Sequence, residues 1–97
     1  MKDMSHVLKL IEHPHQQLYT GTFGECLFFA RKKRGLLWTT LAGKLGLFWQ
    51  AIPATENDVR QPSIDEVSML AQILSCQFIA PGDTLSGAWM VQLYNKE

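Results

Sequence analysis

The chain has no long run of apolar residues, no net charge and only two cysteines among its 97 residues. The first absence excludes a membrane-spanning helix, which requires about 20 consecutive apolar residues. Cys26 and Cys76 lie far apart and outside any paired motif, which excludes a disulfide-rich scaffold. A hydrophobic fraction of 46% and a charged fraction of 19% are typical of a globular domain. We therefore expect one small soluble domain with both thiols reduced and partly buried.

Catalytic and metal-binding patterns are also absent. No serine or cysteine stands with a histidine and an acid at a recognisable spacing, and there is no phosphate-binding glycine loop. His13 and His15 flank Pro14 in a predicted turn, without the i, i+4 spacing of a helical zinc site. We expect no enzyme, no cofactor and no metal site. The N-terminus lacks an apolar signal segment, so a cytoplasmic location is expected.

Helix boundaries are marked clearly between residues 22 and 75. Two capping boxes indicate helix N-termini, at Thr22 with Glu25 and at Ser63 with Glu66. Gly35 and Gly46 stand where glycine ends a helix in the left-handed conformation. These signals predict a helix, a second short helix, a sharp glycine turn and a third helix, followed by an amphipathic helix from Ser63.

The same stretch resembles a known family through residues that match its pattern without a gap. They are Arg31, Gly35-Leu36, Leu41-Ala42, Leu45-Gly46-Leu47, Ile52, Glu56, Pro62-Ser63-Ile64, Leu70-Ala71 and Leu74. The pattern is similar to that of the Cro/C1-type (XRE) helix-turn-helix domains. This resemblance implies a mainly α fold, a five-helix lambda-repressor-like domain over residues 22–75. It also implies a buried ion pair between Arg31 and Glu56 that joins the first and third helices.

The two ends of the chain are expected to add to this domain. Residues 1–21 are interpreted as an N-terminal extension in which residues 6–11 form a short helix or a strand. Residues 76–97 predict a C-terminal strand or hairpin, in which Trp89, Val91 and Leu93 alternate with other residues. An isolated strand is unstable, so it must pair. We expect it to pair with a second copy and form a homodimer, as in HipB-like antitoxins; the alternative is a hairpin folded onto its own domain, beside residues 6–11.

The resemblance places candidate DNA contacts on the second and third helices and on the loop that follows. We expect contacts from Thr39, Thr40, Lys44, Trp49, Gln50, Asn57 and Arg60. Gln50 is the one that could read an adenine, whereas the others would contact phosphates or thymine methyl groups. Residues 22–62 carry six cations against three anions, so this region is the positive part of the chain. Pro53 inside the third helix predicts a helix that is short, bent or displaced.

Apolar residues stand where this family usually has polar ones, which leaves three interpretations open. The chain could still bind double-stranded DNA as a transcriptional regulator, which we expect to be an autorepressing antitoxin of a toxin-antitoxin system or else a phage or plasmid repressor. Alternatively, Trp38, Phe48 and Trp49, with Leu37 and Leu47, could bind a protein partner while the helix-turn-helix serves as a scaffold. The tryptophans could also simply be core residues.

Overall fold

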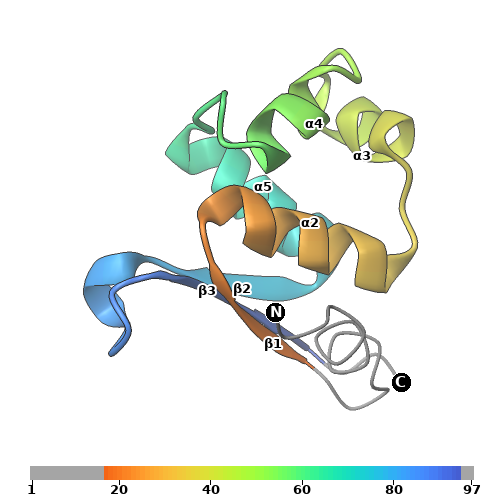
Figure 1. Ribbon diagram of the computed structural model, residues 1–97. Coiled ribbons are helices and arrows are strands. Elements are labelled where there is room, and N and C mark those ends of the chain that lie inside the picture. The colour runs from red at the N-terminus through yellow and green to blue at the C-terminus, as the bar shows by residue number, and fades with distance from the viewer. Residues whose placement is uncertain (1–16, 95–97) are drawn as a thin grey trace, which may run out of the picture.

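The computed structural model describes residues 17–94, in which the helices lie on one side of a β-sheet (Figure 1). Strand β1 (Leu18–Gly21) leads into helix α2 (Phe23–Arg34). Helices α3 (Trp38–Leu45), α4 (Ala51–Glu56) and α5 (Ile64–Leu74) follow, and then strand β2 (Cys76–Ile79), a 3-10 turn η1 (Pro81–Asp83) and strand β3 (Trp89–Leu93). Residues 1–16, including the predicted helix or strand at 6–11, lie outside the described part.

The expectation of a mainly α, five-helix domain is wrong. Residues 17–94 contain four α-helices and a three-stranded antiparallel sheet, so this part of the chain is a small α+β domain. Within this range no additional helix lies between α4 and α5, because Asp58 takes the left-handed conformation (φ 61°) two residues after the end of α4 and Pro62 precedes the N-cap Ser63. The flanking residues, which were expected to be appendages, form the sheet beneath the helices.

The sheet has the order β1-β3-β2, so β3 is its central strand. β1 pairs with β3 with Tyr19 opposite Val91, and β2 pairs with β3 with Phe78 opposite Val91. Both edges of β3 are therefore occupied within the same chain. The strand expected to pair with a second copy through Trp89, Val91 and Leu93 instead pairs internally, and Val91 and Leu93 are buried in the core. The hairpin folds onto its own domain, with residues 18–21 of β1 beside β3. Residues 6–11, the expected neighbour, lie outside the described range.

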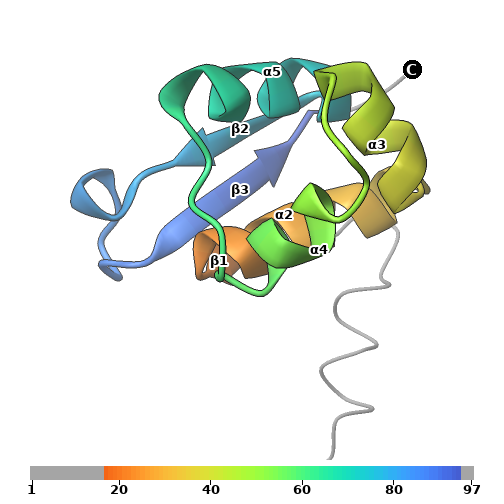
Figure 2. The ribbon, with the colours of Figure 1, turned by 90° about the horizontal axis from the view of Figure 1, so that it is seen from above.

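Helices α2 and α5 cover one face of the sheet, and α3 and α4 lie farther from it (Figures 1 and 2). The hydrophobic core lies between these layers. Leu27, Leu41, Ile52 and Leu74 bring one fully buried side chain from each helix, and Val91 contributes from the sheet. Phe23 packs against Phe78 and Trp89, with ring centroids 4.9 and 5.0 Å away.

Both predicted capping boxes are present. Thr22 accepts a hydrogen bond from the Glu25 amide and Ser63 from the Glu66 amide, and in each box the glutamate accepts a hydrogen bond from the cap amide. Gly35 and Gly46 adopt the left-handed conformation at φ 70° and 73°. These local signals therefore mark helix ends where the sequence predicted them.

Gly24 allows α2 and α4 to approach closely. A Cβ atom at this position would lie 2.2 Å from the Glu56 carbonyl oxygen and 2.6 Å from the Thr55 carbonyl oxygen. Both are backbone atoms, so a side chain could be accommodated only by moving the helices apart. The contact between α2 and α4 therefore requires glycine.

Gly24→Ala should lower the free energy of unfolding by about 1 to 3 kcal/mol or more, because of this overlap. Gly43→Ala on α3 is the matched control, because a Cβ atom at that position would have no neighbouring atom within 4 Å among the described residues. Alanine there should raise the stability by up to about 1 kcal/mol through helix propensity. Urea denaturation of both variants measures the difference, and equal effects would show that α2 and α4 do not meet at Gly24.

Candidate functional site

The candidate site is the unit made of α3, the turn at residues 46–50 and α4, which we call the α3–α4 unit. It lies at the end of the molecule opposite the sheet (Figure 1). α3 ends at Gly46, whose amide bonds to the Ala42 and Gly43 carbonyls, and Leu47 donates to Ala42 at 2.9 Å. These bonds make the turn out of α3 a short and defined one.

Pro53 determines where α4 begins. It is the third residue of this six-residue helix, within the first turn, where backbone N–H groups have no partner inside a helix. The missing amide therefore removes no helical hydrogen bond. The residues before it form single turns instead, with Ala51 donating to Phe48 at 3.0 Å and Ile52 donating to Trp49 at 3.1 Å. α4 is short, as the proline predicted.

A buried ion pair joins α2 to α4. Arg31 Nε donates to Glu56 Oε2 and Arg31 Nη2 donates to Glu56 Oε1 at 3.1 Å, with both side chains less than a tenth exposed. The remaining Arg31 nitrogen, Nη1, donates to the Leu36 carbonyl at 2.9 Å. The predicted pair between Arg31 and Glu56 is therefore confirmed, and its two-point geometry sets the position of α4 relative to α2.

Aromatic rings cover this ion pair. Trp38 Nε1 donates to Glu56 Oε1 at 3.2 Å, and the Arg31 guanidinium carbon lies 5.6 Å from the ring centroids of both Trp38 and Phe28. Trp49 stacks on Trp38 with centroids 5.9 Å apart and planes 11° apart. Trp38 is thus part of the ion-pair network, through an indole N–H that can only donate.

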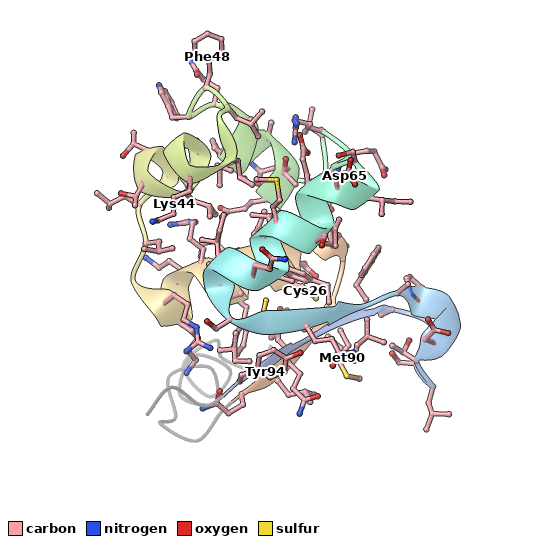
Figure 3. The ribbon with its side chains drawn as sticks, turned by 180° about the vertical axis from the view of Figure 1, so that it is seen from behind. Cys26, Lys44, Phe48, Asp65, Met90 and Tyr94 are labelled. Atoms are coloured by element: carbon pink, nitrogen blue, oxygen red, sulfur yellow. The ribbon has the colours of Figure 1, made fainter. Side chains whose placement is uncertain are left out.

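The surface of the unit is apolar as well as polar. Phe48 is 87% exposed and extends away from the molecule at the tip of the unit (Figure 3). Leu37, Trp38 and Trp49 are also exposed, and Leu47 is half-buried. We call these five residues the aromatic patch. The tryptophans of this patch are therefore not ordinary core residues, since a large part of each ring is exposed.

Most of the predicted DNA contacts lie on the surface of the α3–α4 unit. Four are exposed on α3 and at the start of α4, namely Thr39, Thr40, Lys44 and Gln50, and Asn57 is exposed at the C-terminus of α4. Arg60 is engaged elsewhere, because its guanidinium donates to the Thr55 hydroxyl at 3.0 Å and to Glu66 Oε2 at 2.7 Å. This contact lowers the pKa of Glu66, chiefly through the hydrogen bond.

Two charged residues for which no partner was predicted, Asp58 and Arg34, connect elements that lie far apart in the chain. Asp58 lies just beyond the C-terminus of α4. It accepts hydrogen bonds from the Gly24 amide at 2.9 Å and from the Thr22 hydroxyl at 2.6 Å, and so caps the N-terminus of α2. Arg34 donates to the carbonyls of Leu74, Ser75 and Tyr94 at 2.7 to 2.8 Å. The left-handed backbone at Asp58 had a usable sequence signal, because Asp is among the few residues that tolerate this conformation. No sequence signal indicated the partners of Arg34.

Both cysteines are buried free thiols, and no metal centre is evident in the described part. Burial raises the pKa of Cys26 and of Cys76 to about 12, so both remain protonated thiols at neutral pH. Among residues 17–94 no group of three His, Cys, Asp or Glu side chains could hold a metal ion. The three histidines precede residue 17 and lie outside this range. No helix within the same range is both long enough and apolar enough to cross a membrane.

The described residues thus define a small α+β domain with a projecting two-helix unit that an ion pair braces. Comparisons of the chain with protein-family models, with curated proteins and with solved structures gave no match. The site must therefore be interpreted from its own geometry.

Arg31→Met should lower the free energy of unfolding by about 3 to 5 kcal/mol, because Glu56 would remain buried without its cation. The double variant Arg31→Met with Glu56→Met should recover much of this loss, since no charge would remain buried. Thermal and urea unfolding of the single and double variants measures the coupling. Additive losses in the double variant would contradict a direct interaction between these two residues.

Proposed function

We propose that the α3–α4 unit is a helix-turn-helix and that the chain is a DNA-binding regulator of transcription. The observation that carries the proposal is that two short helices, joined by a glycine turn and held by the Arg31–Glu56 pair, project from the domain with polar side chains on their surface. In a helix-turn-helix the second helix enters the major groove and the first crosses the phosphate backbone.

In this arrangement α4 would enter the major groove from its N-terminal end. Gln50 stands at the N-cap position, is exposed, and carries the paired donor and acceptor that bind the edge of an adenine. Trp49 beside it offers an apolar surface to thymine methyl groups. Lys44 and the hydroxyls of Thr39 and Thr40 would contact phosphates from α3.

Contacts within the fold engage many of the cations, so electrostatic attraction should contribute only weakly to DNA binding. Arg31 and Arg60 are paired with glutamates, Arg34 donates to carbonyl groups, and the Lys33 ammonium lies 5.7 Å from the Phe29 ring centroid. At least four of the six cations in residues 22–62 therefore have internal partners. Few phosphates can therefore be neutralised by each chain, and affinity should depend only modestly on salt. Such a regulator would bind DNA more tightly with a protein partner that adds further contacts.

An autorepressing antitoxin is the regulator that we propose within this class, with a phage or plasmid repressor as the alternative. An antitoxin must engage both DNA and a toxin protein. The chain offers polar groups and the aromatic patch on one unit, which supports such a double role. A repressor would require the polar groups alone.

Lys44→Ala should weaken binding to every duplex and reduce the slope of log K against log salt by about 0.9 for each phosphate that is no longer neutralised. Fluorescence anisotropy on the DNA upstream of the chain's own gene, at several salt concentrations, measures this slope. Lys32→Ala on α2 is the matched control outside the unit. Gln50→Ala should instead relax preference at one base pair. An unchanged slope for Lys44→Ala would contradict the proposal.

A second candidate function, docking of a protein partner on the aromatic patch without sequence-specific DNA binding, is favoured by the exposure of Phe48. A large aromatic side chain that is 87% exposed contributes almost nothing to the core. With Leu37, Trp38 and Trp49 it makes a cluster of exposed apolar residues on one unit, and such clusters mark interaction sites. Aromatic residues of this kind dominate the binding energy of protein interfaces.

Phe48→Ala should leave the free energy of unfolding unchanged within about 0.5 kcal/mol, because the ring is on the surface. If the patch docks a partner, the same change should abolish binding of the protein encoded beside this chain, measured by calorimetry with the purified pair. Leu85→Ala, which removes a fully exposed leucine from the loop before β3, is the control. Full binding by Phe48→Ala would eliminate the patch as the docking surface.

A further inference from the structure

The outer edge of β2 is an unpaired strand edge in the described part of the chain. β2 lies at one side of the sheet, and within residues 17–94 it pairs only with β3. The Tyr94 amide donates to the Ser75 carbonyl at 2.9 Å, so the backbone groups of these two residues point toward each other. Because directions alternate along a strand, Gln77 and Ile79 also face β3, and Phe78 and Ala80 turn their amides outward.

A groove runs along this edge. It has a volume of about 550 Å³ and lies between α5 and β2, which pack side by side (Figure 3). Ile64, Val67 and Ala71 of α5 form much of one wall, and Phe78 and Ile79 belong to the other. An extended segment lying in the groove could therefore bond to the strand edge while burying apolar side chains against α5.

The edge carries none of the sequence features that prevent strand pairing. β2 reads Cys76-Gln77-Phe78-Ile79, without a charged residue or a proline, and proteins usually protect exposed edges with one or the other. Among the described residues, the only charged side chain that lines the groove is Asp83, in the turn after β2. Asp83 is exposed, and its carboxylate has no hydrogen-bond or ion-pair partner in residues 17–94.

We propose that this groove binds an extended peptide segment of another protein, added to the sheet as a fourth strand beside β2. The segment would place apolar side chains at alternate positions against α5, and a lysine or arginine near Asp83. The proposal is independent of DNA binding, since the groove shares no residue with the α3–α4 unit.

The test is amide hydrogen exchange of the full chain, followed by NMR, with a short synthetic peptide of alternating valine and threonine that ends in lysine. The peptide should slow exchange at the amides of Phe78 and Ala80, which gain acceptors. It should leave Gln77 and Ile79 unchanged, because they already bond to β3. Exchange that is unaffected at Phe78 and Ala80 at saturating peptide would overturn the proposal.

Ala80→Pro is the sharpest variant. Ala80 has φ of −70°, which proline adopts without strain, and its amide makes no hydrogen bond in the described residues, so the fold should be kept. Loss of this donor should weaken peptide binding about 3- to 10-fold, the equivalent of one hydrogen bond. Unchanged affinity in a folded Ala80→Pro protein would contradict strand addition at this edge.

Asp83→Asn tests the charge. It should weaken binding of the lysine peptide about 2- to 5-fold and leave unchanged a peptide with glutamine in place of lysine. Asp65→Asn, which removes a charge from α5 outside the groove, is the matched control. Equal effects of the two variants would remove Asp83 from the site. Protection of Phe78 and Ala80 that rises with protein concentration, without peptide, would assign the edge to a second copy and overturn the proposal.

Discussion

The buried pair of Arg31 and Glu56 is the interaction on which the arrangement of the helices depends. It joins α2 to α4, whose backbones approach closely at Gly24 because that residue has no side chain. Removing two charges from water is costly unless their hydrogen bonds are satisfied. Here Arg31 uses Nε and both terminal nitrogens, and Glu56 also accepts from Trp38. Because a misplaced α4 would leave these charges unpaired, the pair selects one orientation of the α3–α4 unit.

Several charged residues of this domain connect its secondary-structure elements. Asp58 and Arg34 each connect elements that are far apart in sequence, one at the N-terminus of α2 and the other at the junction of α5 with β3. Arg60 holds the loop before α5 through Glu66. A count of cations in the sequence therefore overstates the positive field that the folded surface presents, since Arg31 and Arg60 are paired with glutamates inside the molecule.

The α3–α4 unit combines two kinds of surface that are usually found on different proteins. Its polar groups suit contact with a duplex, whereas Phe48 and the stacked tryptophans suit contact with an apolar partner. Trp38 links the two, because its indole covers the ion pair on one side and stacks with Trp49 on the other. Changes at this residue would therefore affect both the bracing of the unit and its surface.

What the sequence alone determined is where the capped helices begin and end and which residues are apolar enough to be buried, because capping boxes and left-handed glycines are local signals. The Arg31–Glu56 pair was also predictable, but from a family resemblance rather than from spacing. Only the tertiary structure decided that β3 lies between β1 and β2 in one chain, that Arg34 and Arg60 are engaged internally, and that Asp58 caps α2. The physical reason is that these outcomes depend on contacts between residues far apart in the chain, whose free energy appears only once the helices have packed.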